Sequence, residues 1–480
     1  MSAAAVPVLA TKLPSAGTLA VLAAIAVVAI AVLSYVMRRH AHALPLLAVF
    51  ALPFRVPIST QGRTVNLLVP LYLVIAAGVL VHLLPRLARG ELWPRRRQER
   101  ASMRSLAFWG STEGLRLVLL IAVALYALQG SYSSDHTKAA ENLAFFYVPF
   151  GLLFVLLSGV DWTRELLLRC LALLVALAVL FAGVGFVEYD RKSLLLNPKV
   201  VAANEYDNYF RVNSVFFDPS IYGRFLALVM IAITTAVLWS VRRRHVLVGA
   251  ALLAWLLAGL VTSFSQSSIA ALLLACAILA AWRWSVSATL YASCALAVLA
   301  LAVLLAAPAS LHFGLKGSGG SANNATSGRA NLVEGGLKLF AKRPLEGYGS
   351  GSFETQYRRN NTRSAGSNAV SASHTIPVTI AAEQGIVGLA VYLALIASAL
   401  SVLFRGAGRS PPRIALAACF AALVLHTWAY ADFLEDPFTW TLLAIGVALA
   451  ARDAPAPAPA PALAPAAGST PSAGLAAAGQ

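Results

Sequence analysis

One histidine and one glutamate lie close together where a long polar segment meets an apolar run. His374 stands in the polar part of the stretch 371–388, and Glu383 stands in its apolar part. A carboxylate in apolar surroundings is costly unless it is paired or lies near water, whereas a histidine exchanges a proton near neutral pH. Two hypotheses follow for His374: proton transfer, and a polar loop or helix-entry residue, which these residues alone favour. For Glu383 they favour a structural role, as a carboxylate that holds a nearby arginine, over direct catalysis.

Cationic side chains gather in the same polar segment and in a second one further towards the N-terminus. Arginine binds phosphate oxygens through two parallel hydrogen bonds, so these segments favour an anionic ligand such as a phosphate. The alternative is solvated surface charge in contact with lipid. The cations of segment 310–375 are Lys316, Arg329, Lys338, Lys342, Arg343, Arg358, Arg359 and Arg363; those of segment 188–220 are Arg191, Lys192, Lys199 and Arg211, with Arg224 in the next apolar run.

Other chemistry has little support in the sequence. We find no HExxH motif, no DxD pair and no P-loop. We therefore expect no metal and no nucleotide cofactor. The four cysteines all fall within apolar runs and show no metal-ligand spacing. We find no recognition module of aromatic and basic residues, so the sequence does not indicate nucleic-acid binding. Three further histidines, His136, His312 and His426, are weaker candidates than His374 because their settings are less distinctive.

These residues are embedded in a chain that is far more apolar than a soluble protein. Of 480 residues, 59% are hydrophobic and 12% are charged, against about 25% charged in a typical soluble domain. Apolar runs recur that are long enough to cross a hydrocarbon layer of ~30 Å as helices, and they predict an all-α polytopic membrane protein with about 11–13 transmembrane helices. The predicted spans are 17–37, 41–54, 65–84, 112–129, 143–160, 165–187, 221–241, 246–262, 269–282, 286–307, 386–404, 414–431 and 438–451.

The distribution of arginine predicts the orientation. The net charge is +17, and the arginine-rich segment 85–105 is expected on the cytoplasmic side. One orientation then suits every short loop and places segments 188–220 and 310–375 outside. We divide the chain into N-terminal helices (1–208), a second transmembrane unit (209–451) that carries the outer loop 310–375, and a disordered Ala/Pro-rich tail (452–480).

The outer loop is expected to contain local structure. The Gly/Ser-rich part 317–328 is predicted to be mobile. An amphipathic helix is predicted over 329–342, with Leu332, Leu339 and Phe340 as its apolar positions. A tight turn over 344–349 and a short helix over 352–359 should follow.

Four stretches in this order resemble the O-antigen ligase and polymerase superfamily of bacterial envelope polysaccharide enzymes. RVNSVFFDPS from Arg211 resembles the pattern R…G.F..PN, and TSFSQSS from Thr262 resembles T.SR. The stretch from Arg329 to Gly349 resembles R…W..A…..P..G.G, and the stretch from His374 to Gly388 resembles H[NT]……E.G..G. The resemblance covers roughly residues 211–404.

The resemblance implies a fold like that of the membrane glycosyltransferases of type C and an active site on the outer face of the bacterial plasma membrane. It implies transfer of a glycan from an undecaprenyl-pyrophosphate carrier to a hydroxyl of a glycan, lipid or protein acceptor, without metal or nucleotide. His374 would then be the general base. Arg211 and Arg329 would hold the pyrophosphate, and Arg224, Arg343 and Glu383 would complete the substrate-binding set.

The chain departs from the family pattern at three places. Gln266 stands where many relatives have arginine, so Arg224 is a candidate to supply that contact. Asn213 and Ser214 occur where the pattern has glycine, and Thr375 replaces the commoner asparagine. Ligase and polymerase share these motifs, so both stay open. A transporter of lipid-linked glycans and a non-catalytic envelope scaffold are the competing classes.

Overall fold

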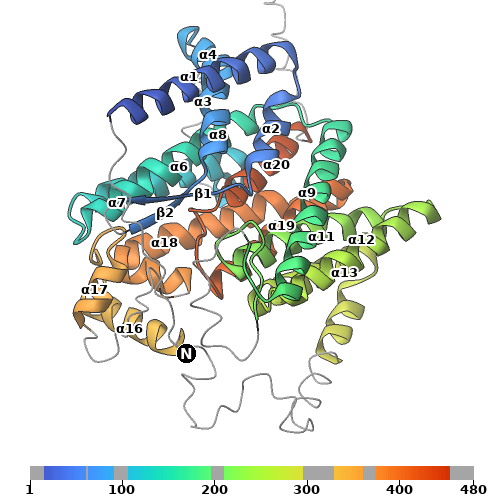
Figure 1. Cartoon of the computed structure of the whole chain (residues 1–480). Coiled ribbons are helices and arrows are strands. Elements are labelled where there is room, and N and C mark those ends of the chain that lie inside the picture. Colours follow the sequence, from blue (N-terminus) through green and yellow to red (C-terminus); the bar gives the residue numbers. More distant parts are fainter. Residues whose placement is uncertain are drawn as a thin grey trace, which may run out of the picture.

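The computed structural model describes residues 16–60, 63–90, 106–195, 210–295, 329–360, 373 and 375–453. All structural statements below concern these residues. They form a bundle of long apolar helices, with two short helices, α16 and α17, set against it (Figure 1). The predicted mobile part 317–328, the tail after residue 453 and most of the basic segment 85–105 lie outside the described residues.

Within the described part, ten helices are long and apolar enough to cross a membrane, and Val286–Ala295 and α20 (Pro437–Arg452) are shorter apolar helices. The protein is therefore an all-α polytopic membrane protein, as predicted. The ten are α1 (Ala16–Arg39), α3–η1–α4 (Val69–Gly78, Val79–Leu83 and Leu84–Ala88), α6 (Thr112–Gly130), α7–η2–α8 (His136–Asn142, Leu143–Tyr147 and Val148–Ser158), α9 (Arg164–Arg191), α11 (Pro219–Leu238), α12 (Arg243–Thr262), α13 (Gln266–Arg283), α18 (Ile376–Phe404) and α19 (Pro411–Trp428).

Two predicted spans near the N-terminus have a different structure. The stretch 41–54 contains α2 (Ala43–Ala51), whose 9 residues reach only about 14 Å at ~1.5 Å per residue. After it, β1 (Val56–Thr60) pairs in antiparallel register with β2 (Arg63–Leu67). The predicted span at 65–84 therefore begins only at Val69, where a proline in the first turn suits a helix start. This hairpin is the exception to the all-α prediction in the described structure.

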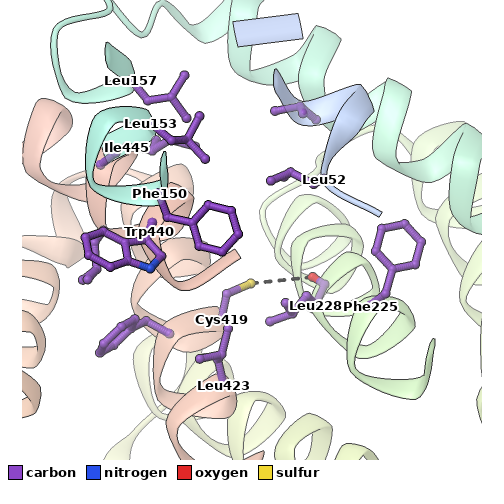
Figure 2. Packing of buried hydrophobic residues seen from close by; sticks show 14 of the residues in the cluster. Leu52, Phe150, Leu153, Leu157, Phe225, Leu228, Cys419, Leu423, Trp440 and Ile445 are labelled. Atoms are coloured by element: carbon purple, nitrogen blue, oxygen red, sulfur yellow. Dashed lines mark hydrogen bonds between the residues drawn. The ribbon is translucent and has the colours of Figure 1, made fainter. Parts of the chain in front are cut away.

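The bundle is held together by one large apolar core. Phe150 and Leu153 of α8 face Trp440 of α20, and Cys419 of α19 lies opposite α11 (Figure 2). The Cys419 Sγ lies 3.6 Å from the Leu228 carbonyl oxygen, so the two helices approach closely at this level. Small residues such as Cys419 permit this proximity.

The elements of segment 310–375 that the structure describes match the prediction closely. Helix α16 spans Arg329–Lys342, and α17 spans Phe353–Asn360. A small core of their own joins them to α18, with Leu332, Leu339 and Phe353 among its buried members. The turn between α16 and α17 contains Gly347 and Gly349 at positive φ.

Loops that are far apart in sequence meet at one end of the bundle, which we call the loop end. Ser133 donates to the Ser350 carbonyl at 2.7 Å, and Thr355 donates to Asp135 at 2.9 Å. Val212 donates to the Thr262 carbonyl at 3.2 Å. The loop end therefore brings together the polar segments in which the sequence places its candidate residues.

Candidate functional site

Arg211 lies on the turn between α12 and α13. Its Nε donates a hydrogen bond to the Ser263 carbonyl at 3.1 Å, and its side chain is half-buried. The backbone of Val212 contacts the same turn through Thr262. Two of the sequence motifs, those that begin at Arg211 and at Thr262, therefore form one unit.

Glu188 at the end of α9 fixes the backbone that follows Arg211. Its carboxylate accepts hydrogen bonds from the backbone N–H groups of Ser214 at 2.8 Å and of Asn213 at 3.3 Å. Ser214 has a positive φ of 52°, which non-glycine residues rarely adopt. Glu188 was not predicted as a site residue, because nothing in its local sequence shows that its partners come from the segment after residue 210.

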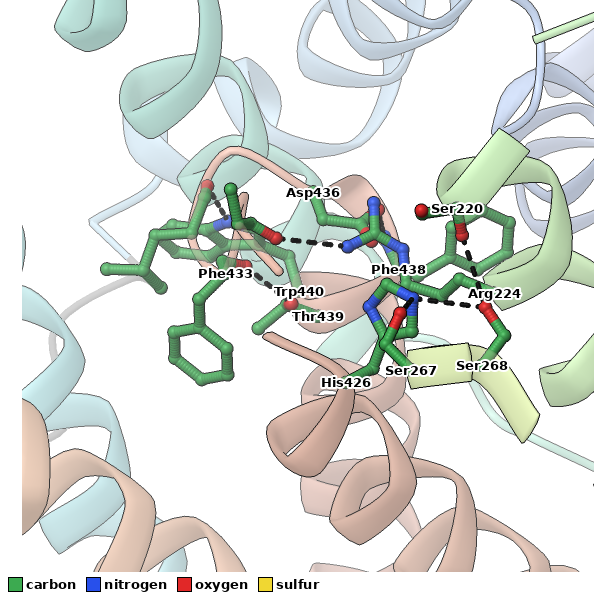
Figure 3. Close-up of polar contacts among 12 residues, drawn as sticks. Ser220, Arg224, Ser267, Ser268, His426, Phe433, Asp436, Phe438, Thr439 and Trp440 are labelled. Atoms are coloured by element: carbon green, nitrogen blue, oxygen red, sulfur yellow. Dashed lines mark hydrogen bonds and ion pairs between the residues drawn. The ribbon is translucent and has the colours of Figure 1, made fainter. Parts of the chain in front are cut away.

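Arg224 forms a buried ion pair rather than an exposed cation. Its guanidinium lies 3.0 Å from Asp436, and the two side chains are 3% and 1% exposed. It also donates to the Ala431 carbonyl at 3.4 Å. Figure 3 shows Arg224 and Asp436 facing each other between α11 and the loop before α20. Gln266, whose missing positive charge Arg224 was predicted to supply, is the exposed first residue of α13.

His426 of α19 reaches the first turn of α13. Its Nε2 lies 3.2 Å from Ser267 Oγ and 3.1 Å from Ser268 Oγ (Figure 3). The ring is 1% exposed. The sequence ranked His426 below His374 because its serine partners belong to a helix that is remote in sequence.

Glu383 binds the turn between α16 and α17. Its carboxylate accepts hydrogen bonds from the backbone N–H groups of Gly351 at 2.8 Å and of Phe353 at 2.9 Å. The backbone carbonyl of Glu383 accepts from Gly349 at 2.8 Å. These bonds satisfy a carboxylate that is 8% exposed within an apolar helix, so the turn compensates for its burial.

The turn and α18 touch backbone to backbone. Gly385 has a φ of +65° inside α18, where it kinks the helix. A Cβ at Gly385 would lie 2.1 Å from the Leu345 carbonyl oxygen, and one at Gly347 would lie 2.3 Å from the Glu383 carbonyl oxygen. Only glycine fits at both positions. Gly347 of the family-like motif at 344–349 and Gly385 of the motif that begins at His374 thus have a packing reason.

A second carboxylate lies close to this turn. Asn142 donates from Nδ2 to Glu435 at 2.9 Å and to the Tyr126 hydroxyl at 2.9 Å. Burial raises the pKa of the Glu435 carboxyl, and the nearby Asp432 raises it further, while Lys138 and Arg55 oppose the shift. Glu435 was not predicted as a site residue.

Of the remaining predicted residues, Arg329 and Arg343 belong to the segment around α16, and His374 precedes α18 in the sequence. The Arg343 guanidinium lies 4.8 Å from the ring centre of Tyr348, and the residue is exposed. Arg329 is the first residue of α16. His374 lies outside the described residues, directly before Thr375, the residue that precedes α18. No group of three or more His, Cys, Asp or Glu side chains suited to a metal ion occurs among the described residues.

Helices α16 and α18 run in parallel. A Cβ at Gly336 of α16 would lie 2.5 Å from Val378 Cγ1 of α18. Further along, Ile386 donates to the Pro344 carbonyl at 2.7 Å. The residue numbers rise together on both sides, so the Arg329 end of α16 lies at the same end as the entry into α18.

The fold and this loop end define a multi-pass membrane protein whose polar loops converge on one side. Residues 251–393 match the protein family described as O-antigen ligase. The match confirms the predicted resemblance to the O-antigen ligase and polymerase superfamily and indicates a role in envelope polysaccharide synthesis. It includes Arg329, Arg343 and Glu383, whereas Arg211 and Arg224 precede it. No curated protein matches the chain.

Proposed function

We propose that the protein transfers a glycan from an undecaprenyl-pyrophosphate carrier to an acceptor hydroxyl on the outer face of the bacterial plasma membrane. The observation that carries this proposal is the parallel contact between α16 and α18 inside the segment that matches the O-antigen ligase family. It supports a site in which Arg329 and His374 act together, because Arg329 stands at the same end of this helix pair as Thr375, the residue that follows His374 in the sequence.

In the proposed reaction, His374 takes the proton from the acceptor hydroxyl. The acceptor oxygen attacks the anomeric carbon of the donor, the bond from that carbon to the pyrophosphate oxygen breaks, and undecaprenyl pyrophosphate leaves. A positioned base contributes about 10²–10⁴-fold to such a rate. His374 returns its proton to solvent or to the departing diphosphate before the next turnover.

Arg211 and Arg329 are proposed to hold the pyrophosphate and to offset the negative charge that grows on it, without a metal ion. Fixed cations at the leaving group stabilise the transition state because they need no rearrangement during the reaction. The bond from Arg211 Nε to the Ser263 carbonyl supports this role, since it uses Nε and fixes the direction of the guanidinium. Arg343 is proposed as a further contact to the donor.

Arg224 and Glu383 are proposed to support the site from behind. The partners of Arg224 are Asp436 and Ala431, which favours a role in holding the loop before α20 over direct contact with pyrophosphate. The two backbone hydrogen bonds to Glu383 favour a role in holding the turn after α16.

The test is to supply the purified protein with a lipid-linked oligosaccharide and a series of candidate acceptors, and to measure product masses. The proposal predicts an acceptor that gains the mass of the glycan, with release of undecaprenyl pyrophosphate. One added glycan indicates ligation, and a ladder of masses indicates polymerisation. Movement of the intact donor across a vesicle membrane without a new bond would instead identify a transporter.

A further inference from the structure

The α12–α13 turn that carries the partner of Arg211 is strained. Phe264 has a φ of +49°, which is rare and strained for a bulky side chain. Such a conformation persists only where neighbouring contacts hold it. Ser263 Oγ donates to the Leu260 carbonyl at 2.6 Å and accepts from the Ser265 N–H at 3.2 Å. These bonds lie within the turn itself, so an outside contact is needed to fix it in the bundle.

A chain of buried hydroxyl groups connects the turn to its neighbours. Ser268 Oγ lies 3.3 Å from the Ser220 carbonyl and 2.7 Å from Ser265 Oγ. In the arrangement that satisfies every one of these contacts, the single Ser268 proton goes to the Ser220 carbonyl, because a carbonyl only accepts. Ser268 then accepts from Ser265, and Ser265 accepts from Ser267, whose Oγ lies 3.3 Å away.

The same arrangement makes His426 a donor. Ser267 and Ser268 donate their protons elsewhere in it, so each accepts from the histidine. We therefore assign a hydrogen to Nε2 of His426, shared between the two hydroxyl oxygens at 3.2 and 3.1 Å. The histidine is the donor that begins the chain His426 to Ser268 to the Ser220 carbonyl, which joins α19, α13 and α11.

This chain of hydrogen-bonded hydroxyl groups ends beside Ser263, whose carbonyl accepts the hydrogen bond from Arg211. A Cβ at Gly223 of α11 would lie 2.8 Å from Ser268 Oγ and 3.0 Å from Ser263 Oγ, so α11 packs directly on the turn. Ser263 supplies the carbonyl that binds Arg211 Nε at 3.1 Å. A shift of the first turn of α13 would move this carbonyl and Arg211 with it.

We propose that His426 is a positioning residue that sets the place of Arg211 through the α12–α13 turn. The inference rests on the proposed function, in which Arg211 binds the pyrophosphate of the donor. His426 does not touch the donor in this account. Its loss should weaken the use of donor and leave the use of acceptor unchanged.

The experiment compares His426→Ala, His426→Gln and Arg211→Ala in the transfer assay, with donor and acceptor varied separately. Cys419→Ala is the matched control, because Cys419 is buried on the same helix and contacts α11 away from the turn. We expect His426→Ala to raise the donor KM about tenfold, the effect of one well-placed hydrogen bond. The acceptor KM should change less than about twofold. His426→Gln keeps a side-chain N–H donor, so its donor KM should lie close to the wild-type value. Cys419→Ala should lower thermal stability without changing the donor KM.

The double variant Arg211→Ala/His426→Ala separates the possible outcomes. If His426 acts through Arg211, the double variant is no worse in donor use than Arg211→Ala alone. If the effects of the two substitutions on the donor KM add up in the double variant, or if His426→Gln is as impaired as His426→Ala, the positioning role is wrong. The proposed function still stands in that case, provided that Arg211→Ala alone raises the donor KM. If Arg211→Ala itself leaves the donor KM unchanged, both the positioning role and the proposed pyrophosphate contact are wrong.

Discussion

Arg224 and Asp436 form an ion pair at 3.0 Å in which neither side chain is more than 3% exposed. A charge buried this deeply is tolerated because its partner lies opposite, and removing one partner leaves the other uncompensated. The pair therefore joins α11 to the loop before α20 (Figure 3).

Asp436→Asn should therefore lower the thermal midpoint of the purified protein strongly, by the equivalent of about 3–5 kcal/mol. Asparagine keeps the oxygen that caps α20 through the Phe438 N–H, so the loss reports the charge. The double variant Arg224→Met/Asp436→Asn should be less destabilised. Asp161→Asn is the control because the Asp161–Arg452 pair is exposed at 3.9 Å. Equal midpoints for Asp436→Asn and the wild-type protein would contradict the account.

Gly385→Ala tests the contact between α18 and the turn after α16. Alanine would be strained at a φ of +65° and would meet the Leu345 carbonyl at 2.1 Å. We expect loss of transfer activity and faster limited proteolysis within 344–360. Gly151→Ala is the control, since its Cβ would find Trp440 at an ordinary 3.9 Å. Equal protease sensitivity of the two variants would show that the turn does not depend on this contact.

Glu383 variants separate support of the turn from catalysis. Glu383→Ala removes both acceptor oxygens, whereas Glu383→Gln keeps one of them for Gly351 or Phe353. If Glu383 holds the turn, glutamine should retain clearly more transfer activity at saturating substrates than alanine, because each lost buried bond costs about 1–3 kcal/mol. The measurement is kcat for both variants. Equal, near-complete loss of kcat in both would instead indicate a proton-transfer role.

Glu435 predicts a pH dependence of stability. Burial raises its folded pKa above the unfolded value of about 4.3. The folded state then holds a proton that the unfolded state has lost, so stability is highest below the unfolded pKa and falls as pH rises through the folded pKa. Glu435→Gln should therefore gain thermal stability relative to wild type at pH 8 but not at pH 4. Glu354→Gln, in α17, is the control. If Glu435→Gln changes thermal stability by the same amount at both pH values, the raised folded pKa of Glu435 is wrong.

Local patterns predicted the described elements of segment 310–375 well. Helix α16 has the predicted bounds because its apolar residues repeat at helical spacing, and Leu332 and Leu339 are buried as expected. The start of α18 was placed too late, at Ile386 instead of Ile376. Glu383 interrupts the apolar run, and nothing local shows that backbone N–H groups of another segment satisfy its carboxylate.

Long-range polar contacts were not predictable from one sequence. His426 and its serine partners are separated by 158 and 159 positions, and Glu188 and its partners Asn213 and Ser214 are separated by 25 and 26 positions. Arg224 was expected to bind the anionic substrate. Its pairing with Asp436 could not be predicted, because it depends on how α11 packs against the loop before α20. The assignments of His374, Arg211 and Arg329 to catalysis and to pyrophosphate stay predictions.

The most direct measurement of the central claim is transfer by His374→Ala with a defined lipid-linked donor and acceptor. Product formation and binding of the carrier lipid should be measured on the same preparation, with Arg329→Ala in parallel. We predict that His374→Ala loses about 10²–10⁴-fold in kcat, the contribution of a positioned base, and still binds the carrier. Arg329→Ala should instead weaken the use of donor. Full transfer by both variants would contradict the proposed mechanism.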